Sequence, residues 1–293
     1  MPAFLIRLLT ALWMLASWTS ASTAATTTTE AVTTPPANRV VALTPHITEL
    51  VYAAGGGDKL IATVSSSDYP PAAKKLPRIG DGLSVNAESL LALQPDLVIA
   101  WHEKSAAQAL APTLQKLSIP LHYIEPRRLV DIPLAISQLG VLMGTQTVAK
   151  AKALALNNEL TQLEQRYAKA TPVSVFIEVG TAPLYTIGND PLLNDTLRIC
   201  GGINVYQDSM LAAPLISTED VLARQPDVVI VGSRNQAQLA TRQHAWKQLT
   251  LKAATTDHIY GLDPDALFRP GPRMLEAAKT LCTYLDSARL SMQ

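Results

Sequence analysis

The sequence has few charged residues and no excess of either sign, with 24 basic and 24 acidic side chains among 293 residues. Because binding to nucleic-acid phosphates needs a concentrated positive face, this composition argues against a nucleic-acid partner. Cysteine is also scarce, and only Cys200 and Cys282 are present. In an oxidising compartment such a pair favours one disulfide, although two reduced, buried cysteines would also fit.

Sequence motifs that would specify an enzyme are missing. The five histidines are scattered, without a His-x-His pair or a His-Glu-x-x-His motif. No Gly-x-Ser-x-Gly elbow, phosphate-binding loop or Gly-x-Gly-x-x-Gly fingerprint occurs, and no Cys-x-x-Cys pattern suggests redox catalysis or a structural metal. We therefore expect no catalytic residues, no metal site and no cofactor.

The N-terminus has the pattern of an export signal. Arg7 precedes an apolar run, Leu8 to Trp18, and small residues follow up to Ala25. An uncleaved anchor is the alternative, but the run is short for a membrane span of roughly 20 residues. We predict a signal peptide over residues 1–25, a flexible Thr/Pro-rich leader over 26–38, and a soluble mature protein in the periplasm.

Two segments of the chain have similar sequences. "NAESLLALQPDLVIAW" covers residues 86–101 and "STEDVLARQPDVVIVG" covers 217–232. Around each copy, continuous apolar strand runs alternate with helical segments, which is typical of parallel sheets covered on both faces. The apolar pattern predicts a helix over residues 105–117. Residues 145–169 lack proline and have apolar side chains at helical spacing, which predicts one helix of about 25 residues with a buried face of Val148, Leu154, Leu156, Leu160 and Leu163. The sequence thus predicts an α/β protein with two similar lobes joined by a long helix, divided as 39–143, 144–170 and 171–293.

Two sets of side chains stand out as candidates for function. Glu88 and Glu219 occupy the same place in the two copies, two residues after a plausible helix N-cap, where a carboxylate also stabilises the helix end by itself. Other candidates follow inferred strands, where ligands of open α/β sheets bind: Tyr69, Trp101, Asp265 and Arg269. The simpler interpretations are that Tyr69 packs a turn and that Asp265 pairs only with Arg269.

Six segments occur in an order that resembles a known family. They are "RVVALTPHITELVYAAG", "SDYPP", "ESLLALQPDLVIAW", "CGG", "EDVLARQPD" and "LFRPGPR". Together they resemble the cobalamin (vitamin B12) binding proteins of ABC importers, within the helical-backbone periplasmic receptors. The resemblance covers nearly all of residues 39–285. "SDYPP", "IAW" and the paired cysteines point to the cobalamin branch.

The resemblance implies two Rossmann-like lobes joined by one rigid backbone helix, with cobalamin or a related corrinoid held in the cleft between them. It implies a monomeric, non-enzymatic receptor that delivers its ligand to a dimeric membrane permease with ATPase subunits. By position, Tyr69, Trp101, Asp265 and Arg269 match ligand contacts, and Glu88 and Glu219 match carboxylates that dock on permease arginines. Cys200 and Cys282 match the family's disulfide.

The sequence also departs from this family. Tryptophans are expected near Gly82, Ala213 and Ala266, so the cleft has lost aromatic surface. A haem or iron-siderophore receptor of the same fold is therefore the main alternative, followed by an exported chelate-processing enzyme. Whether His102, beside Trp101, reaches ligand or solvent is not determined by the sequence.

Overall fold

The structure, a computed structural model, describes residues 35–292. The predicted signal peptide and most of the leader lie outside this range. The leader was predicted to continue to Asn38, but hydrogen bonds already hold the chain at Ala37, whose backbone N–H donates to Leu142 O at 2.8 Å. At Asn38, the backbone N–H donates to an Asp96 carboxylate oxygen at 2.9 Å.

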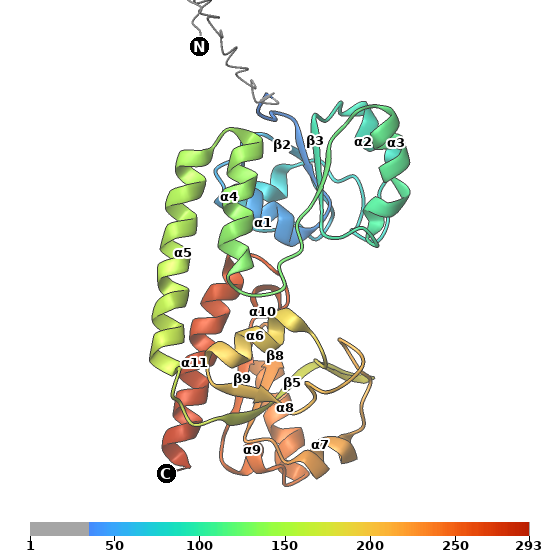
Figure 1. The fold of residues 1–293 in the computed structure, drawn as a ribbon. Helices are drawn as coiled ribbons and strands as arrows, with labels where there is room; N and C mark the ends of the chain where they lie inside the picture. Colours follow the sequence, from blue (N-terminus) through green and yellow to red (C-terminus); the bar gives the residue numbers. More distant parts are fainter. Residues whose placement is uncertain (1–34, 293) are drawn as a thin grey trace, which may run out of the picture. The chain divides into compact units, whose positions relative to one another are not determined.

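The first lobe is built on a four-stranded sheet in the order β2-β1-β3-β4, and all its strand pairs are parallel (Figure 1). The strands are β1 (Val40–Ala42), β2 (Leu60–Ala62), β3 (Leu97–Ala100) and β4 (Leu121–Tyr123). The helices are α1 (Pro45–Ala53), α2 (Ala87–Ala92), α3 (Ala111–Lys116) and the 3₁₀ turns η1 (Pro71–Lys75) and η2 (Ala106–Ala109). Helix α1 ends before Gly55, which takes the left-handed conformation (φ 80°) that favours glycine after a helix.

The second lobe has a five-stranded sheet in which β6, β5, β8 and β9 lie in that order and β7 also pairs with β5. Only the β5–β6 pair is antiparallel. Its strands are β5 (Val173–Thr181), β6 (Leu184–Thr186), β7 (Gly202–Asn204), β8 (Val228–Gly232) and β9 (Ile259–Leu262). Its helices are α6 (Pro191–Ile199), α7 (Thr218–Arg224), α8 (Gln236–Gln248), α9 (Lys252–Thr255), α10 (Pro264–Leu267) and α11 (Arg273–Ser291). The two-lobed α/β prediction is confirmed.

Helices α4 (Asp131–Met143) and α5 (Gln146–Tyr167) lie between the two sheets in the chain order. Helix α5 falls within the segment predicted to connect the lobes, and it runs beside α4 and α11 (Figure 1). Its buried face agrees with the predicted one at Leu156 and Leu160 but differs in the first half, where Ala149 and Ala153 are buried and Val148 and Leu154 are exposed. Small side chains allow the neighbouring helix to approach closely, and composition alone does not reveal this.

A second difference concerns residues 105–117, where one helix was expected. The structure has η2 and then α3, with Pro112 in the first turn of α3. Proline lacks the N–H that would continue a helix from η2, and its ring clashes with the preceding turn, so the helix restarts at Ala111.

Buried apolar side chains form one continuous cluster through both lobes. It includes Leu50 of α1, Leu139 of α4, Leu156 of α5, Leu193 of α6 and Leu281 of α11. Each lobe adds a smaller cluster on the other side of its sheet. The lobes are therefore joined by shared core packing as well as by a helix, which opposes large relative motion.

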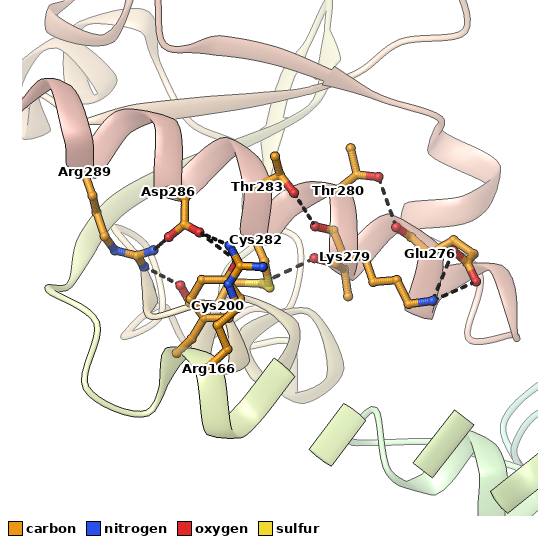
Figure 2. The surroundings of a disulfide bond; sticks show 11 residues. Arg166, Cys200, Glu276, Lys279, Thr280, Cys282, Thr283, Asp286 and Arg289 are labelled. Carbon is orange, nitrogen blue, oxygen red and sulfur yellow. Dashed lines mark hydrogen bonds and ion pairs between the residues drawn. A yellow bond between two sulfur atoms is a disulfide. The ribbon is translucent and has the colours of Figure 1, made fainter. Parts of the chain in front are cut away.

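The predicted disulfide is present between Cys200, at the end of α6, and Cys282 in α11, with their Cα atoms 4.7 Å apart. Figure 2 shows that Arg289 reaches the same place from the next turns of α11. Its guanidinium donates to the backbone oxygens of Cys200 and Thr171 and to the Asp286 carboxylate. The bond and these contacts fasten α11 against the start of the second sheet.

Candidate ligand-binding cleft

The cleft is formed where strands of both sheets end. Trp101 directly follows β3, and its side chain is 37 % exposed. In the second lobe, Arg234 follows β8, and Asp265 and Arg269 follow β9 and lie around the short helix α10. Because the strands of each sheet are mostly parallel, their carboxyl ends meet at one edge, where ligands of such sheets bind.

Trp101 lines two adjacent hollows. The larger, of about 700 Å³, lies in the first lobe. Its lining includes Thr44, residues 82–85, His102, Lys104 and the η2 turn. The smaller, of about 120 Å³, takes its walls from both lobes: Glu125 to Arg127 on one side, and Asp190, Phe268 and Met274 on the other. His102 thus faces the larger hollow beside Trp101, and the indole separates the first-lobe hollow from the space between the lobes.

Behind Trp101 lies His46 of α1, which is almost fully buried. The two rings meet edge to face with their centroids 5.2 Å apart. Burial, followed by the nearby positive charges of Arg269 and His102, lowers the pKa of His46 to about 3. The imidazole is therefore neutral at pH 7 and supports Trp101 as an uncharged packing surface, with Thr44 Oγ1 at 3.3 Å from its Nε2.

Arg273, at the start of α11, reaches from the second lobe to two residues of the first. Its guanidinium donates to both carboxylate oxygens of Glu49, at 2.6 and 2.9 Å, and lies 4.3 Å from the centre of the Tyr69 ring. Glu49 is nearly inaccessible, and burial raises its pKa although the bond and charge of Arg273 oppose this. The hydrogen bond to Glu49 in turn raises the pKa of Arg273. Tyr69 remains 44 % exposed, so part of its ring is accessible beside this ion pair.

Arg269 also connects the lobes. It contacts Asp68 of the first lobe at 2.9 Å and Asp265 of its own lobe at 2.8 Å. Asp265 in turn accepts from Arg234, with one of the two contacts at 3.1 Å. The hydrogen bond from Arg234 lowers the pKa of Asp265, outweighing burial. For Asp68 burial raises the pKa, but the bond and charge of Arg269 outweigh it and the net shift is downward.

The structure brings Tyr69, Asp265 and Arg269 into one polar cluster, and Trp101 lies near it across His46. The predicted pairing of Asp265 with Arg269 exists. Sequence reasoning missed the partners of this cluster: Glu49, Asp68, Arg234 and Arg273, together with His46. A signal was available for two of them, since His46 and Glu49 are the only ionisable residues before Tyr52 in the mostly apolar run of α1.

Glu88 and Glu219 are exposed in the first turns of α2 and α7. Each helix is capped by the residue two positions earlier: Asn86 accepts from Ser89 N at 2.8 Å, and Ser217 accepts from Asp220 N at 3.2 Å. Backbone N–H donation at the helix end lowers the pKa of Glu219. Within residues 35–292 neither carboxylate forms an ion pair, so both remain available to a partner.

One of the positions that lack an expected tryptophan, Gly82, lies in the wall of the larger hollow. Gly82 lines the larger hollow with φ 92°, a conformation that strains any residue with a Cβ, although the space beside it is open. Next to it, Leu83 is 90 % exposed and lines the same hollow. At this point of the cleft an aliphatic side chain therefore supplies the apolar surface.

Among the described residues, no group of three or more His, Cys, Asp or Glu side chains is arranged to hold a metal ion. Within the same range, no helix combines the length and the apolar character that crossing a bilayer requires.

Comparison with known proteins agrees with this architecture. The family model described as periplasmic binding protein matches residues 40–266. The chain belongs to the periplasmic binding protein family. A vitamin B12-binding protein of Pectobacterium atrosepticum is 36% identical over 259 residues, which cover 86% of this chain and 90% of that protein. One from Vibrio cholerae is 34% identical over 256 residues, covering 87% and 91%.

Solved structures of periplasmic binding proteins show the same fold. The crystal structure of the periplasmic vitamin B12-binding protein of Vibrio cholerae has a TM-score of 0.80 at 34% identity, over 87% of this chain and 98% of that one. A periplasmic heme-binding protein of Roseiflexus has a TM-score of 0.74 at 25% identity, over 86% and 99%. Solved structures with this fold thus include a vitamin B12-binding protein and a heme-binding protein.

Proposed function

We propose that this chain captures cobalamin, or a related corrinoid, in the cleft between its lobes and delivers it to the permease of an ABC importer. The observation that carries the proposal is the likeness to vitamin B12-binding proteins at 34–36% identity over most of both chains. The heme-binding relative has the same fold at 25% identity. A haem or iron-siderophore receptor of the same fold is therefore the alternative.

The cleft has the features that a large, amide-rimmed tetrapyrrole needs. Trp101 and Tyr69 offer flat apolar surface, and the larger hollow is within the usual size range of ligand pockets, about 300–1,000 Å³. Arg234 and Asp68 present polar atoms on the exposed side of the ion-paired cluster. We assign Trp101 and Tyr69 to packing against the ligand, and Asp265 and Arg269 to holding its polar rim.

Delivery requires a surface that the permease recognises in the loaded receptor. We assign this role to Glu88 and Glu219, which are exposed, matched between the lobes and without an intramolecular ion pair in the described chain. A permease dimer with basic residues near its two-fold axis would contact both lobes of one receptor molecule, which acts as a monomer. The shared core and the Glu49–Arg273 pair restrict lobe motion, so capture depends on a largely preformed cleft.

We also infer that residues 1–25 are a signal peptide that directs this receptor to the periplasm, in keeping with the family. Export would follow from the charged, apolar and small-residue pattern described above. Mass spectrometry of the mature N-terminus, isolated from the periplasm, tests the cleavage site near Ala24 or Ala25.

Isothermal titration with cyanocobalamin tests the ligand. We expect one site, and we expect Trp101→Ala to weaken binding by about ten- to a hundredfold, because the indole supplies the principal flat contact. Tyr185→Ala is the control, since Tyr185 is a similarly exposed aromatic that lines neither hollow. If micromolar cyanocobalamin gives no heat of binding but haemin does, the ligand of this protein is haem and the corrinoid proposal is wrong.

A further inference from the structure

Arg234, Arg269 and Arg273 gather where the two lobes contact each other, yet they present little uncompensated positive charge. Arg273 is held by Glu49, Arg269 by Asp68 and Asp265, and Arg234 by Asp265. In the second hollow, Arg127 lies 3.9 Å from Glu125. Each of these four guanidinium groups therefore already has a carboxylate partner.

The other charged side chains around the two hollows add no strong positive charge. Asp190 also lines the second hollow, and Asp263 lies 3.9 Å from Arg273, so both add negative charge. Lys104 lines the first hollow and has no ion-pair partner among the described residues, but it is exposed at the rim. Water screens a charge there, so it attracts an anion weakly.

A ligand carboxylate would meet a poor environment in this cleft. To bind Arg269 it would have to displace Asp68, which has no other ion-pair partner among the described residues, or Asp265, which would keep only Arg234. Arg269 and Asp265 are only 16% and 15% exposed, so water compensates poorly for an ion-pair contact that is lost there. If the ion pairs stay intact, the incoming carboxylate instead lies close to the carboxylates of Asp68, Asp263 and Asp265, and like charges repel.

A neutral amide meets no such penalty. The outer N–H groups of Arg234 can donate to an amide oxygen, since 59% of that side chain is exposed. The Asp68 carboxylate, 51% exposed, can accept from an amide N–H. Both contacts form while every existing ion pair remains in place.

We propose that Asp68 and Asp265 determine the ligand specificity of the cleft: by occupying Arg269 and Arg234, they select a chelate with an amide rim and exclude one with free carboxylates. This inference rests on the proposed function and sharpens it. The same fold could accept a carboxylate-bearing tetrapyrrole if these two acidic residues were neutral, because the arginines would then be free to bind it.

The test compares cyanocobalamin with its monocarboxylic acid derivative, in which one peripheral amide is hydrolysed, by titration at pH 7 and low salt. We expect the wild-type protein to prefer the amide form by at least about tenfold, and Asp68→Asn/Asp265→Asn to lose or reverse this preference. The control, Asp58→Asn/Asp208→Asn, removes the same charge from exposed residues that pair with none of these arginines, and it should keep the preference.

The outcomes separate the inference from the function on which it rests. Equal affinity of the wild-type protein for the two forms would overturn the inference, and so would a preference that survives in the double variant. If neither form binds to the wild-type protein, the proposed function itself is wrong. Asp68→Asn alone, at a half-exposed position, provides a second variant should the double variant not fold, and it should reduce the preference part of the way.

Discussion

Reversing the charge of both Glu88 and Glu219 to arginine should reduce ligand uptake by at least about tenfold while leaving ligand affinity unchanged. Both carboxylates are exposed at helix starts, outside both hollows, and neither is paired within residues 35–292. Their replacement by arginine would oppose basic groups of the permease with like charge at both lobes. Uptake of labelled cyanocobalamin by cells that lack the chromosomal receptor measures the effect.

The control variants distinguish loss of permease docking from loss of helix stability as the cause of reduced uptake. Each single reversal should give a smaller loss than the double variant, because one lobe can still engage. Asp58→Arg/Asp208→Arg makes the same change of net charge at exposed positions and should transport normally. Normal uptake by the Glu88/Glu219 double variant would show that the two carboxylates do not dock on the permease. They would then only stabilise their helix ends, by about 0.3–1 kcal/mol each.

Truncating Glu49 to alanine should destabilise the protein by about 3–5 kcal/mol, which is typical for removing one partner of a buried ion pair. The change leaves Arg273, whose side chain is 20% exposed, without the carboxylate that it contacts at 2.6 and 2.9 Å. It also removes the most buried polar link between the lobes. The free energy of unfolding from urea denaturation, without ligand, measures the loss.

Two further variants separate charge from shape. Glu49→Gln keeps the size and one acceptor and should lose less than Glu49→Ala. Glu49→Met/Arg273→Met removes both charges and should recover part of the loss, since a buried pair often contributes little beyond an apolar replacement. A loss below about 1 kcal/mol for Glu49→Ala would show that the pair is not a significant link between the lobes.

Much of the fold could be predicted because its signals are local. The strands are short apolar runs, and α1 ends before Gly55. The two Gln-Pro-Asp motifs indicate the same helix–strand unit in each lobe. Local signals also misled at two places. Pro112 breaks a predicted helix, and in the first half of α5 Ala149 and Ala153 are buried where Val148 and Leu154 were expected.

The candidate site was predictable only in part. Residues that follow strands, such as Trp101 and Asp265, can be found from the strand pattern because parallel strands end at a common edge. Their partners cannot be found in this way. Glu49 and Arg273 are 224 positions apart, and Asp68 and Arg269 are 201 apart. No periodicity connects such pairs.

By itself, the sequence determined that this protein has two related α/β lobes, one pair of cysteines and a matched acidic residue at the start of one helix in each lobe. These properties follow from hydrophobic spacing, capping residues and repetition, which act over a few residues. Only the tertiary structure decided that the arginines of the cleft are already neutralised, and that Trp101 rests on a neutral histidine. Charge compensation depends on distances of about 3 Å between residues far apart in the chain, and packing of the whole molecule sets those distances.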